Sequence, residues 1–178
     1  MNHQDYVDLL RPADLPVGGT WADLGAGSGA FTLALRELVG PEAVLHAADR
    51  DKSRLRELER NFRARFGDVT GLVLLQGDFT RPLHLPPLDG ILMANSLHFY
   101  RDKTSVLTHV SSFLKPGGRF LLVEYNVDSG NLWVPHPLSF KSYRALAPLA
   151  SLTEPRLLAT HSSSFLKGFY SALSYKEK

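Results

Sequence analysis

The stretch Asp23-Leu24-Gly25-Ala26-Gly27-Ser28-Gly29 follows a short apolar run, 21–24, and precedes a segment with helical spacing of its apolar residues. Glycine permits positive φ and lets a ligand lie against bare backbone. A helix that begins here points free N–H groups and the positive end of its dipole at that ligand. The stretch therefore predicts a binding loop for an anionic group. By itself it also satisfies the G-x-G-x-x-A pattern of dinucleotide-binding proteins, through Gly25, Gly27 and Ala30.

Outward from this loop, apolar runs alternate with helical periodicity, which predicts βαβ units and a parallel sheet. Strands are expected at 21–24, 43–49, 72–75, 90–94 and 120–125, and helices at 30–39, 51–66, 103–114 and 138–149. Residues 115–118 (Lys-Pro-Gly-Gly) are expected to form a turn before the fifth strand.

Two further strands are expected near the end of the chain, at 157–162 and 165–175. The few residues between them are far too few for a parallel crossover, so they should form an antiparallel hairpin. The predicted fold class is therefore α/β, with a Rossmann-like, seven-stranded, mostly parallel sheet, helices on both faces and a C-terminal antiparallel hairpin.

Length and composition set bounds on this fold. The chain has 178 residues, 44% of them hydrophobic and 21% charged, which is typical of one globular domain. We expect a single domain over 1–178, with 1–17 as a short N-terminal segment. The chain has no cysteine, which excludes disulfides, a thiolate nucleophile and a Cys-ligated metal, and no metal site is expected.

The charge pattern and the N-terminus narrow the choice of partners. Residues 1–10 include Asp5 and Asp8 and have no apolar h-region, so they do not resemble a secretory signal. No window approaches the ~20 apolar residues of a membrane span, and a cytoplasmic protein that does not bind membranes is expected. The formal net charge of +2 is too small to indicate a polyanionic partner. The basic residues within 51–66 are interpreted as a solvated helix face.

An acidic residue ends the second expected strand. Asp49 lies twenty residues after Gly29, where its carboxylate can accept hydrogen bonds from ribose hydroxyls beside the glycine loop. An alternative role is the N-cap of the next helix, which Asp49 or Asp51 could provide. Both roles are filled if Asp51 or Ser53 is the cap and Asp49 the ribose acceptor.

In combination, these landmarks resemble the class I S-adenosylmethionine-dependent methyltransferases over roughly 18–126, most closely the ubiquinone/menaquinone methyltransferase group. The matching segments are the glycine loop, Asp49, and the stretches 76–79 (Gln-Gly-Asp-Phe), 95–98 (Asn-Ser-Leu-His) and 114–118. The resemblance implies S-adenosylmethionine as cofactor, with S-adenosylhomocysteine as product. The implied cofactor-binding residues are Asp23, Gly25, Ala26, Gly27, Gly29, Asp49, Arg50, Gly77, Asp78, Phe79 and Asn95.

The resemblance also implies which part of the cofactor each residue would contact. Asp23 and Asn95 would lie at the methionine end, Asp49 at the ribose, and Asp78 with Phe79 at the adenine. For Asp78 the alternative is a turn-forming role.

Methyl transfer from a sulfonium is an in-line displacement, and a base is needed only if the acceptor must lose a proton. The candidate catalytic residues follow strands four and five: His98, Tyr100 and Tyr125. His98 could be a general base near neutral pH, or it could only pack or cap. The two tyrosines could equally be half-buried packing aromatics. His136 and Tyr143 are expected across the opening of the site, and Trp133 is either a lid anchor or part of the core.

A small-molecule methyl acceptor is expected, because the segment before the first strand is short and no separate nucleic-acid-binding domain is recognisable. Three alternatives stay open at this point. One is an RNA methyltransferase, suggested by the basic helix 51–66. Another is a cofactor-binding module without activity of its own, and the third is a nicotinamide-dependent dehydrogenase. A homodimer is also left open, and nucleic acid is not the expected partner.

Overall fold

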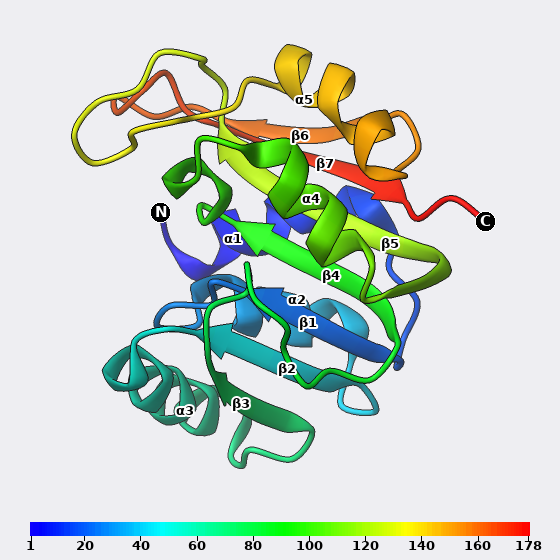
Figure 1. Cartoon of the computed structure of the whole chain (residues 1–178). Helices are drawn as coiled ribbons and strands as arrows, with labels where there is room; N and C mark the ends of the chain where they lie inside the picture. The colour runs from blue at the N-terminus through cyan, green and yellow to red at the C-terminus, as the bar shows by residue number, and fades with distance from the viewer.

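A computed structural model describes all 178 residues of the chain. Its centre is one seven-stranded sheet with the order β3-β2-β1-β4-β5-β7-β6 (Figure 1). The strands are β1 (Thr20–Leu24), β2 (Val44–Asp49), β3 (Leu72–Gln76), β4 (Leu88–Ala94), β5 (Leu114–Tyr125), β6 (Arg156–His161) and β7 (Phe169–Tyr175). The first five are parallel, and β7 is antiparallel to both β5 and β6. The predicted fold class and the C-terminal antiparallel pair are confirmed.

Helices cover both faces of the sheet. They are α1 (His3–Leu10), α2 (Ala30–Val39), α3 (Lys52–Phe66), α4 (Lys103–Ser111) and α5 (Phe140–Leu146), with short 3-10 turns η1 (Arg11–Ala13), η2 (Leu97–Phe99) and η3 (Ala147–Ala150). Figure 1 shows α4 and α5 on the near face and α1 and α2 behind the sheet.

Alternate residues of the central strand β5 serve the two hydrophobic cores. Phe120 and Leu122 belong to the core under α4 and α5, whereas Leu121 and Val123 belong to the core under α1, α2 and α3. Successive side chains of a strand point to opposite faces, and a strand that is buried on both faces reads as a continuous apolar run. The continuous apolar run 120–123 is therefore explained by the burial of this strand on both faces of the sheet.

The segment 115–118 corrects one expectation. Instead of a turn before the strand, β5 begins at Leu114, pairs with Leu88, and next pairs at Arg119 with Gly90. The residues between form a bulge in the strand. Their backbone groups find partners near the chain end, since Gly117 N–H donates to Lys176 O (2.9 Å) and Lys176 N–H donates to Gly118 O (2.8 Å). Helix α4 correspondingly ends at Ser111, three residues earlier than expected.

The hairpin loop is also longer than expected. Strand β7 begins at Phe169 rather than at Phe165, because Leu166 and Lys167 have φ values of +47° and +61°. A strand requires extended backbone with negative φ, so neither residue can belong to it.

The N-terminal segment is part of the same packed structure. Asn2 caps α1 and forms a capping box with Asp5. The helix lies against α2 and against the C-terminal strands, where the Ser171 hydroxyl donates to Leu9 O. None of the helices combines the length and the apolar character needed to cross a membrane.

The strand order places a crevice beside the glycine loop. From β1 the chain proceeds outward to β2 and β3 and then returns to place β4 on the other side of β1. In open α/β sheets such a reversal of strand order opens a crevice at the carboxyl ends of the strands, where ligands bind.

Candidate functional site

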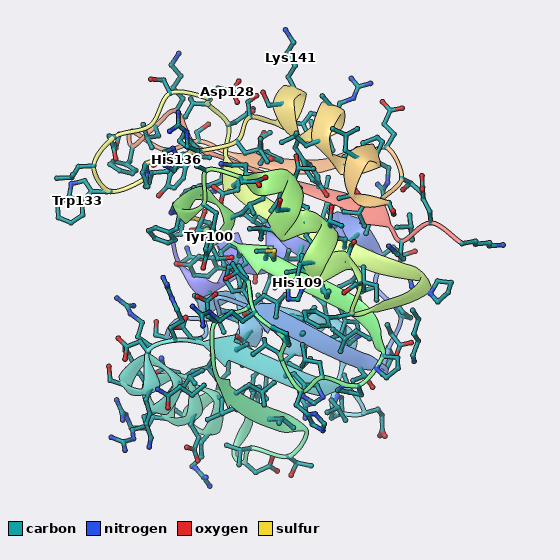
Figure 2. The ribbon with its side chains drawn as sticks, viewed as in Figure 1. Tyr100, His109, Asp128, Trp133, His136 and Lys141 are labelled. Atoms are coloured by element: carbon teal, nitrogen blue, oxygen red, sulfur yellow. The ribbon has the colours of Figure 1, made fainter.

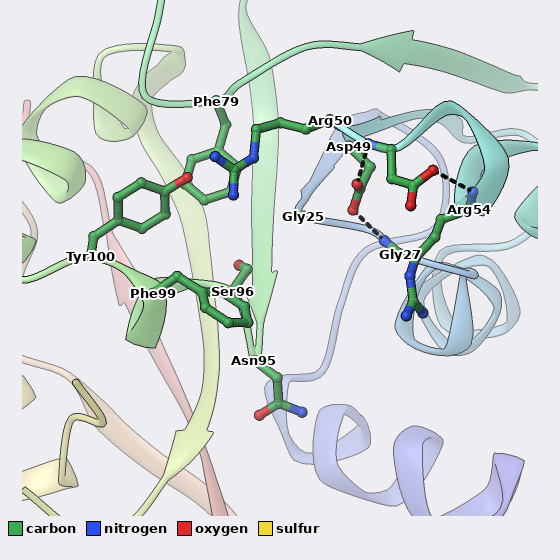
Figure 3. A pocket seen from close by; sticks show the side chains of 11 residues that line it. Gly25, Gly27, Asp49, Arg50, Arg54, Phe79, Asn95, Ser96, Phe99 and Tyr100 are labelled. Atoms are coloured by element: carbon green, nitrogen blue, oxygen red, sulfur yellow. Dashed lines mark hydrogen bonds between the residues drawn. The ribbon is translucent and has the colours of Figure 1, made fainter. Parts of the chain in front are cut away.

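A cavity of about 370 Å³ lies in this crevice (Figure 3). The ends of β1, β2 and β4 and the loop after β3 all contribute to its wall. The lining residues are Gly25, Gly27, Asp49, Arg50, Asp51, Arg54, Phe79, Asn95, Ser96, Phe99 and Tyr100. Six of the eleven expected cofactor residues are among them, so the fold brings together much of a set that is dispersed along the sequence.

The glycines of the loop after β1 have different surroundings. Gly27 has φ +53°, and a Cβ added to it would meet no protein atom within 4 Å, so its bare backbone borders open space. Gly29 has φ +93° and is the N-cap of α2, but a Cβ there would lie 2.6 Å from Leu58 Cγ. Gly27 thus borders the cavity, whereas Gly29 allows α3 to pack closely against the loop. Gly29 does not line the cavity, and neither does Ala26.

Asp49 organises this loop. Its Oδ2 accepts the Gly27 N–H (2.9 Å), and its Oδ1 accepts the Asp51 N–H (2.8 Å). Asp51 itself is the N-cap of α3 and accepts from the N–H groups of Ser53 and Arg54. The cap therefore belongs to Asp51. A carboxylate offers about four lone-pair sites, so Asp49 retains acceptor capacity on the cavity side.

Asn95, at the end of β4, is conformationally unusual and lacks a partner. Its φ of +52° lies in the left-handed region, and its buried Oδ1 has no hydrogen-bond partner. Buried polar atoms are nearly always bonded, and non-glycine residues with positive φ gather at functional sites. The next residue, Ser96, anchors the segment by donating its hydroxyl to Leu24 O (2.8 Å). Asn95 lines the cavity, but its Oδ1 is shielded, so its left-handed backbone at the strand end is the feature that borders the site.

The loop after β3 forms another side of the cavity. Asp78 Oδ1 accepts from the backbone N–H (2.9 Å) and the hydroxyl (2.7 Å) of Thr80, so the turn-forming alternative is what the structure shows. Burial disfavours the charged form of Asp78, but the hydrogen bonds from Thr80 and the nearby Arg50 and Arg81 outweigh it and lower its pKa.

Neither Gly77 nor Asp78 lines the cavity. The apolar wall comes instead from Phe79 and Tyr100, whose rings meet edge to face with centroids 5.3 Å apart. Arg50 extends across the same region, with its Nη1 3.7 Å from Asp78 Oδ2.

Asp23 lies behind the cavity wall. It is only 2% exposed, and its Oδ2 accepts the hydroxyl of Thr32 (2.6 Å). Burial raises the pKa of Asp23 to about 7, the Thr32 hydrogen bond opposes the rise, and the charge of Asp49 adds to it. In this structure Asp23 joins β1 to α2 and does not line the cavity.

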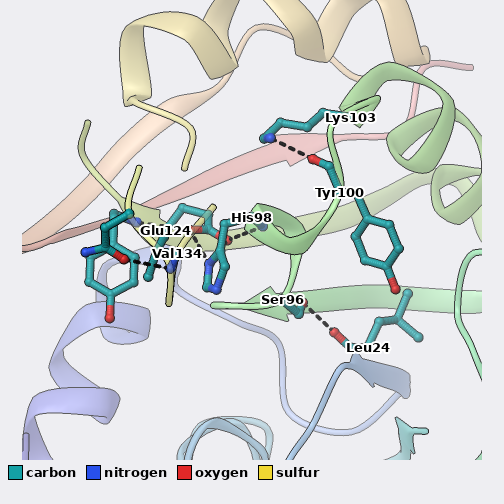
Figure 4. Close-up of polar contacts among 9 residues, drawn as sticks. Leu24, Ser96, His98, Tyr100, Lys103, Glu124 and Val134 are labelled. Carbon is teal, nitrogen blue, oxygen red and sulfur yellow. Dashed lines mark hydrogen bonds and ion pairs between the residues drawn. The ribbon is translucent and has the colours of Figure 1, made fainter. Parts of the chain in front are cut away.

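The three candidate catalytic residues have separate locations. Tyr100 lines the cavity, and its hydroxyl donates to Asp78 Oδ1 (3.5 Å). Tyr125 is half-buried and packs against Phe165 and Phe169, and burial raises the pKa of both tyrosines. His98 is 3% exposed and faces Glu124 rather than the cavity (Figure 4).

Of the two residues expected across the opening of the site, His136 and Tyr143, only His136 lies near it. The His136 N–H donates to His98 O (3.0 Å), which places this residue beside the end of β4. Tyr143 is fully buried, and its hydroxyl bonds to Ser174 Oγ (3.0 Å), so its expected position at the opening is wrong. Trp133 is 75% exposed and points outward into solvent (Figure 2), so it is not part of the core.

Four lining residues are outside the predicted cofactor and catalytic residues: Asp51, Arg54, Ser96 and Phe99. Ser96 follows Asn95 directly, and its only signal is its position at the end of an apolar strand. Arg54 lies in the first turn of α3, where its charge resembled that of the other solvated basic residues. No cluster of acidic residues or histidines suited to a metal ion is present.

Comparison with known proteins defines the class. Residues 22–120 match the family described as "Methyltransferase domain", and the chain belongs to this family. Family membership confirms the resemblance to class I methyltransferases and, with it, the expected cofactor of the class, S-adenosylmethionine. The geometry agrees, since Gly27 offers bare backbone beside Asp49 in the same cavity.

Two curated relatives share part of their length with this chain. One is the ubiquinone/menaquinone biosynthesis C-methyltransferase UbiE of Marinomonas sp., 30% identical over 124 residues that cover 69% of this chain and 49% of that protein. The other is the ribosomal RNA large subunit methyltransferase E of Syntrophobacter fumaroxidans, 29% identical over 66% of this chain and 61% of that protein. The chain thus spans about half the length of the UbiE protein.

Solved structures show the same fold. The YcgJ protein of Bacillus subtilis superimposes with a TM-score of 0.78 at 15% identity, covering 99% of this chain and 100% of that one. An O-methyltransferase family 2 protein of Planctomyces limnophilus, solved with apigenin, gives a TM-score of 0.75 at 24% identity, covering 98% of this chain and 57% of that one.

Proposed function

We propose that this chain binds S-adenosylmethionine in the cavity beside the glycine loop and transfers its methyl group to a small-molecule acceptor. One observation carries the proposal: the open backbone of Gly27, the carboxylate of Asp49 that holds it, and the left-handed Asn95 come from three strand ends and line one cavity.

The cavity wall suggests how the cofactor would be held. Asp49 would accept from the ribose hydroxyls while it continues to hold the Gly27 N–H. Phe79 and Tyr100 would flank the adenine, and Asn95 would lie at the methionine end. Asp23 and Asp78 would act from behind the wall, by fixing the backbone that the ligand touches.

The mechanism needs little covalent chemistry from the chain. When bound, the cofactor supplies an electrophilic methyl group on a sulfonium. The residues of the wall orient it toward the acceptor, and such positioning can account for about 7–11 kcal/mol of the barrier. Phe99, which is 55% exposed and also lines the cavity, would provide an apolar surface beside the transferred group.

A small acceptor is supported by the aromatic side chains of the cavity wall. Phe79, Phe99 and Tyr100 all line the cavity, and pockets lined by aromatic side chains together with a few polar groups are typical of small-molecule sites. We further propose that the chain acts as a single domain, since both hydrophobic cores lie against one sheet.

The experiment is calorimetric titration with S-adenosylhomocysteine. Asp49→Asn should weaken binding about tenfold or more, because it removes the carboxylate charge and one of two backbone acceptors. Asp68→Asn is the matched control, since Asp68 also accepts a backbone N–H, from Thr70 (2.8 Å), but lies away from the cavity. Equal affinity of the two variants would remove Asp49 from the site.

A second candidate, methylation of RNA, has one observation in its favour. Lys52, Arg56 and Arg60 are exposed on α3 and form no ion pair, next to the cavity-lining Arg54. Phosphate contacts would make RNA binding fall steeply with salt. Filter binding at low and high salt tests this, and an absence of RNA retention at low salt excludes it.

A further inference from the structure

A buried, hydrogen-bonded histidine–glutamate pair lies beside the cofactor cavity without lining it. Glu124, near the end of β5, is fully buried, and His98, in η2, is 3% exposed. The Nδ1 of His98 lies 3.0 Å from both carboxylate oxygens of Glu124. The backbone N–H groups of His98 and Tyr125 also donate to this carboxylate, each at 3.1 Å. Glu124 therefore holds the imidazole from a fixed position.

This arrangement determines the tautomer of His98. An ionised carboxylate only accepts hydrogen bonds, so Nδ1 must carry the proton. In the neutral ring, Nε2 then keeps its lone pair, and no group of the protein bonds to it. Figure 4 shows this second nitrogen pointing away from Glu124. A carboxylate that orients an imidazole in this way prepares the other nitrogen to accept a proton and stabilises the imidazolium that forms.

Several titratable groups lie around the pair. Lys103 is 8% exposed and donates to Tyr100 O (2.9 Å). Burial lowers the pKa of Lys103, while the charges of Glu124 and Asp128 oppose that change. The ring of Tyr125 lies beside the imidazole, with centroids 5.8 Å apart. Tyr170 is buried opposite Glu124 on β7, and burial together with the charge of Glu124 raises its pKa. None of these groups forms a hydrogen bond to Nε2 of His98.

His98 is adjacent in sequence to a residue that lines the cofactor cavity. Phe99 lines that cavity, and its ring centroid lies 4.4 Å from that of His98. An acceptor that packs against Phe99 would therefore come close to the imidazole.

We infer that His98 is the general base of the methyl transfer, that Glu124 is its positioning residue, and that the acceptor is a protic O–H or N–H compound. This inference rests on the proposed function. As the acceptor lone pair forms its bond to the methyl carbon, the carbon–sulfur bond breaks and its electron pair stays on sulfur. Nε2 takes the proton that the acceptor loses and releases it to water. An acceptor with no proton to lose, such as a thioether, would gain nothing from this pair.

The first test needs no acceptor. Long-range proton–nitrogen NMR spectra of the ¹⁵N-labelled chain, recorded where histidines are neutral, should show His98 as the Nδ1–H tautomer. His109 is an internal control, because its Nε2 lies 3.1 Å from Arg81 O and must therefore donate as the opposite tautomer. In Glu124→Gln the preference of His98 for Nδ1–H should weaken. An Nε2–H tautomer in the natural chain would overturn the inference.

The second test measures release of S-adenosylhomocysteine with catechol, 4-hydroxybenzoate and benzylamine as protic acceptors and dimethyl sulfide as the aprotic one. At least one protic compound should be methylated. His98→Asn and Glu124→Gln should each lower its kcat by about 10²-fold or more, with KM little changed, whereas His109→Asn should not. Unchanged kcat in His98→Asn, or turnover of dimethyl sulfide alone or of none of the four, would overturn the assignment.

Titration with S-adenosylhomocysteine separates this inference from the proposed function. All three variants should bind it as the natural chain does, because the pair lies outside the cavity wall. Normal binding with an unchanged kcat refutes the base while the cofactor site stands. If the natural chain itself does not bind S-adenosylhomocysteine, the proposed cofactor site is refuted.

Discussion

Replacing Gly27 by alanine should separate ligand binding from folding. The new Cβ would meet no protein atom within 4 Å, so its cost to the fold is the left-handed backbone at φ +53°. For an L-residue this conformation costs about 1–2 kcal/mol, which lowers the melting temperature of a chain of this size by roughly 2–8 °C. The methyl group would, however, occupy the cavity side of the loop, and binding of S-adenosylhomocysteine should weaken at least tenfold.

Two other glycines provide matched comparisons. Gly67, which follows α3 at φ +87°, also has no atom within 4 Å of an added Cβ, so Gly67→Ala should cost the same stability without affecting binding. Gly29→Ala combines φ +93° with a Cβ only 2.6 Å from Leu58 Cγ, and it should destabilise the chain more than either.

The assays are thermal melting and calorimetric titration of the three variants with S-adenosylhomocysteine. If Gly27→Ala binds this ligand as tightly as Gly67→Ala does, the open space beside Gly27 is not the cofactor site. The reasoning about that cavity would then be refuted, even though both proteins are folded.

Three further predictions concern single residues. Asn95→Gly should raise thermal stability by relieving the φ of +52°, yet weaken S-adenosylhomocysteine binding in calorimetry; unaltered affinity would contradict the place of Asn95 in the site. Because burial raises the pKa of Asp23 from 3.8 to about 7, the folded state binds the extra proton, and the free energy of unfolding should fall by up to about 4 kcal/mol as pH rises through this interval. Urea denaturation at several pH values should show that slope in the natural chain and a smaller one in Asp23→Asn. Gly90→Ala should destabilise by about 3 kcal/mol or more, because its Cβ would lie 2.0 Å from the Trp21 ring; chemical denaturation that shows a loss below 1 kcal/mol would contradict that packing.

Much of the fold could be predicted because its signals are local. Apolar runs, helical spacing and glycine punctuation identified the strands, four of the helices and the antiparallel pair at the end. The segment 115–118 was misplaced because its backbone groups pair with Lys176, a contact that no local pattern records. The length of the last loop was misjudged because positive φ at Leu166 and Lys167 has no sequence signature.

The candidate site was predictable to the extent that it follows strand ends. Gly25, Gly27, Asp49 and Asn95 do line one cavity, because parallel strands end at the same edge. The sequence could not distinguish a glycine that faces a ligand from one that admits a neighbouring helix, as Gly29 does.

The sequence also could not show which of the candidate side chains are buried. Tyr143 belongs to the core, and His98 turns toward Glu124 rather than the cavity, because packing across the sheet decides where such side chains point.

The hydrogen bond between Ser171 and Leu9 joins residues 162 positions apart in the chain. It links the first helix to β7, the strand inserted between β5 and β6. Helix α1 can pack against α2 early, but its contacts with β6 and β7 form only after those strands have been synthesised. Contacts of such long range slow folding, so we expect the refolding rate to respond to changes at this seam between the two ends of the chain.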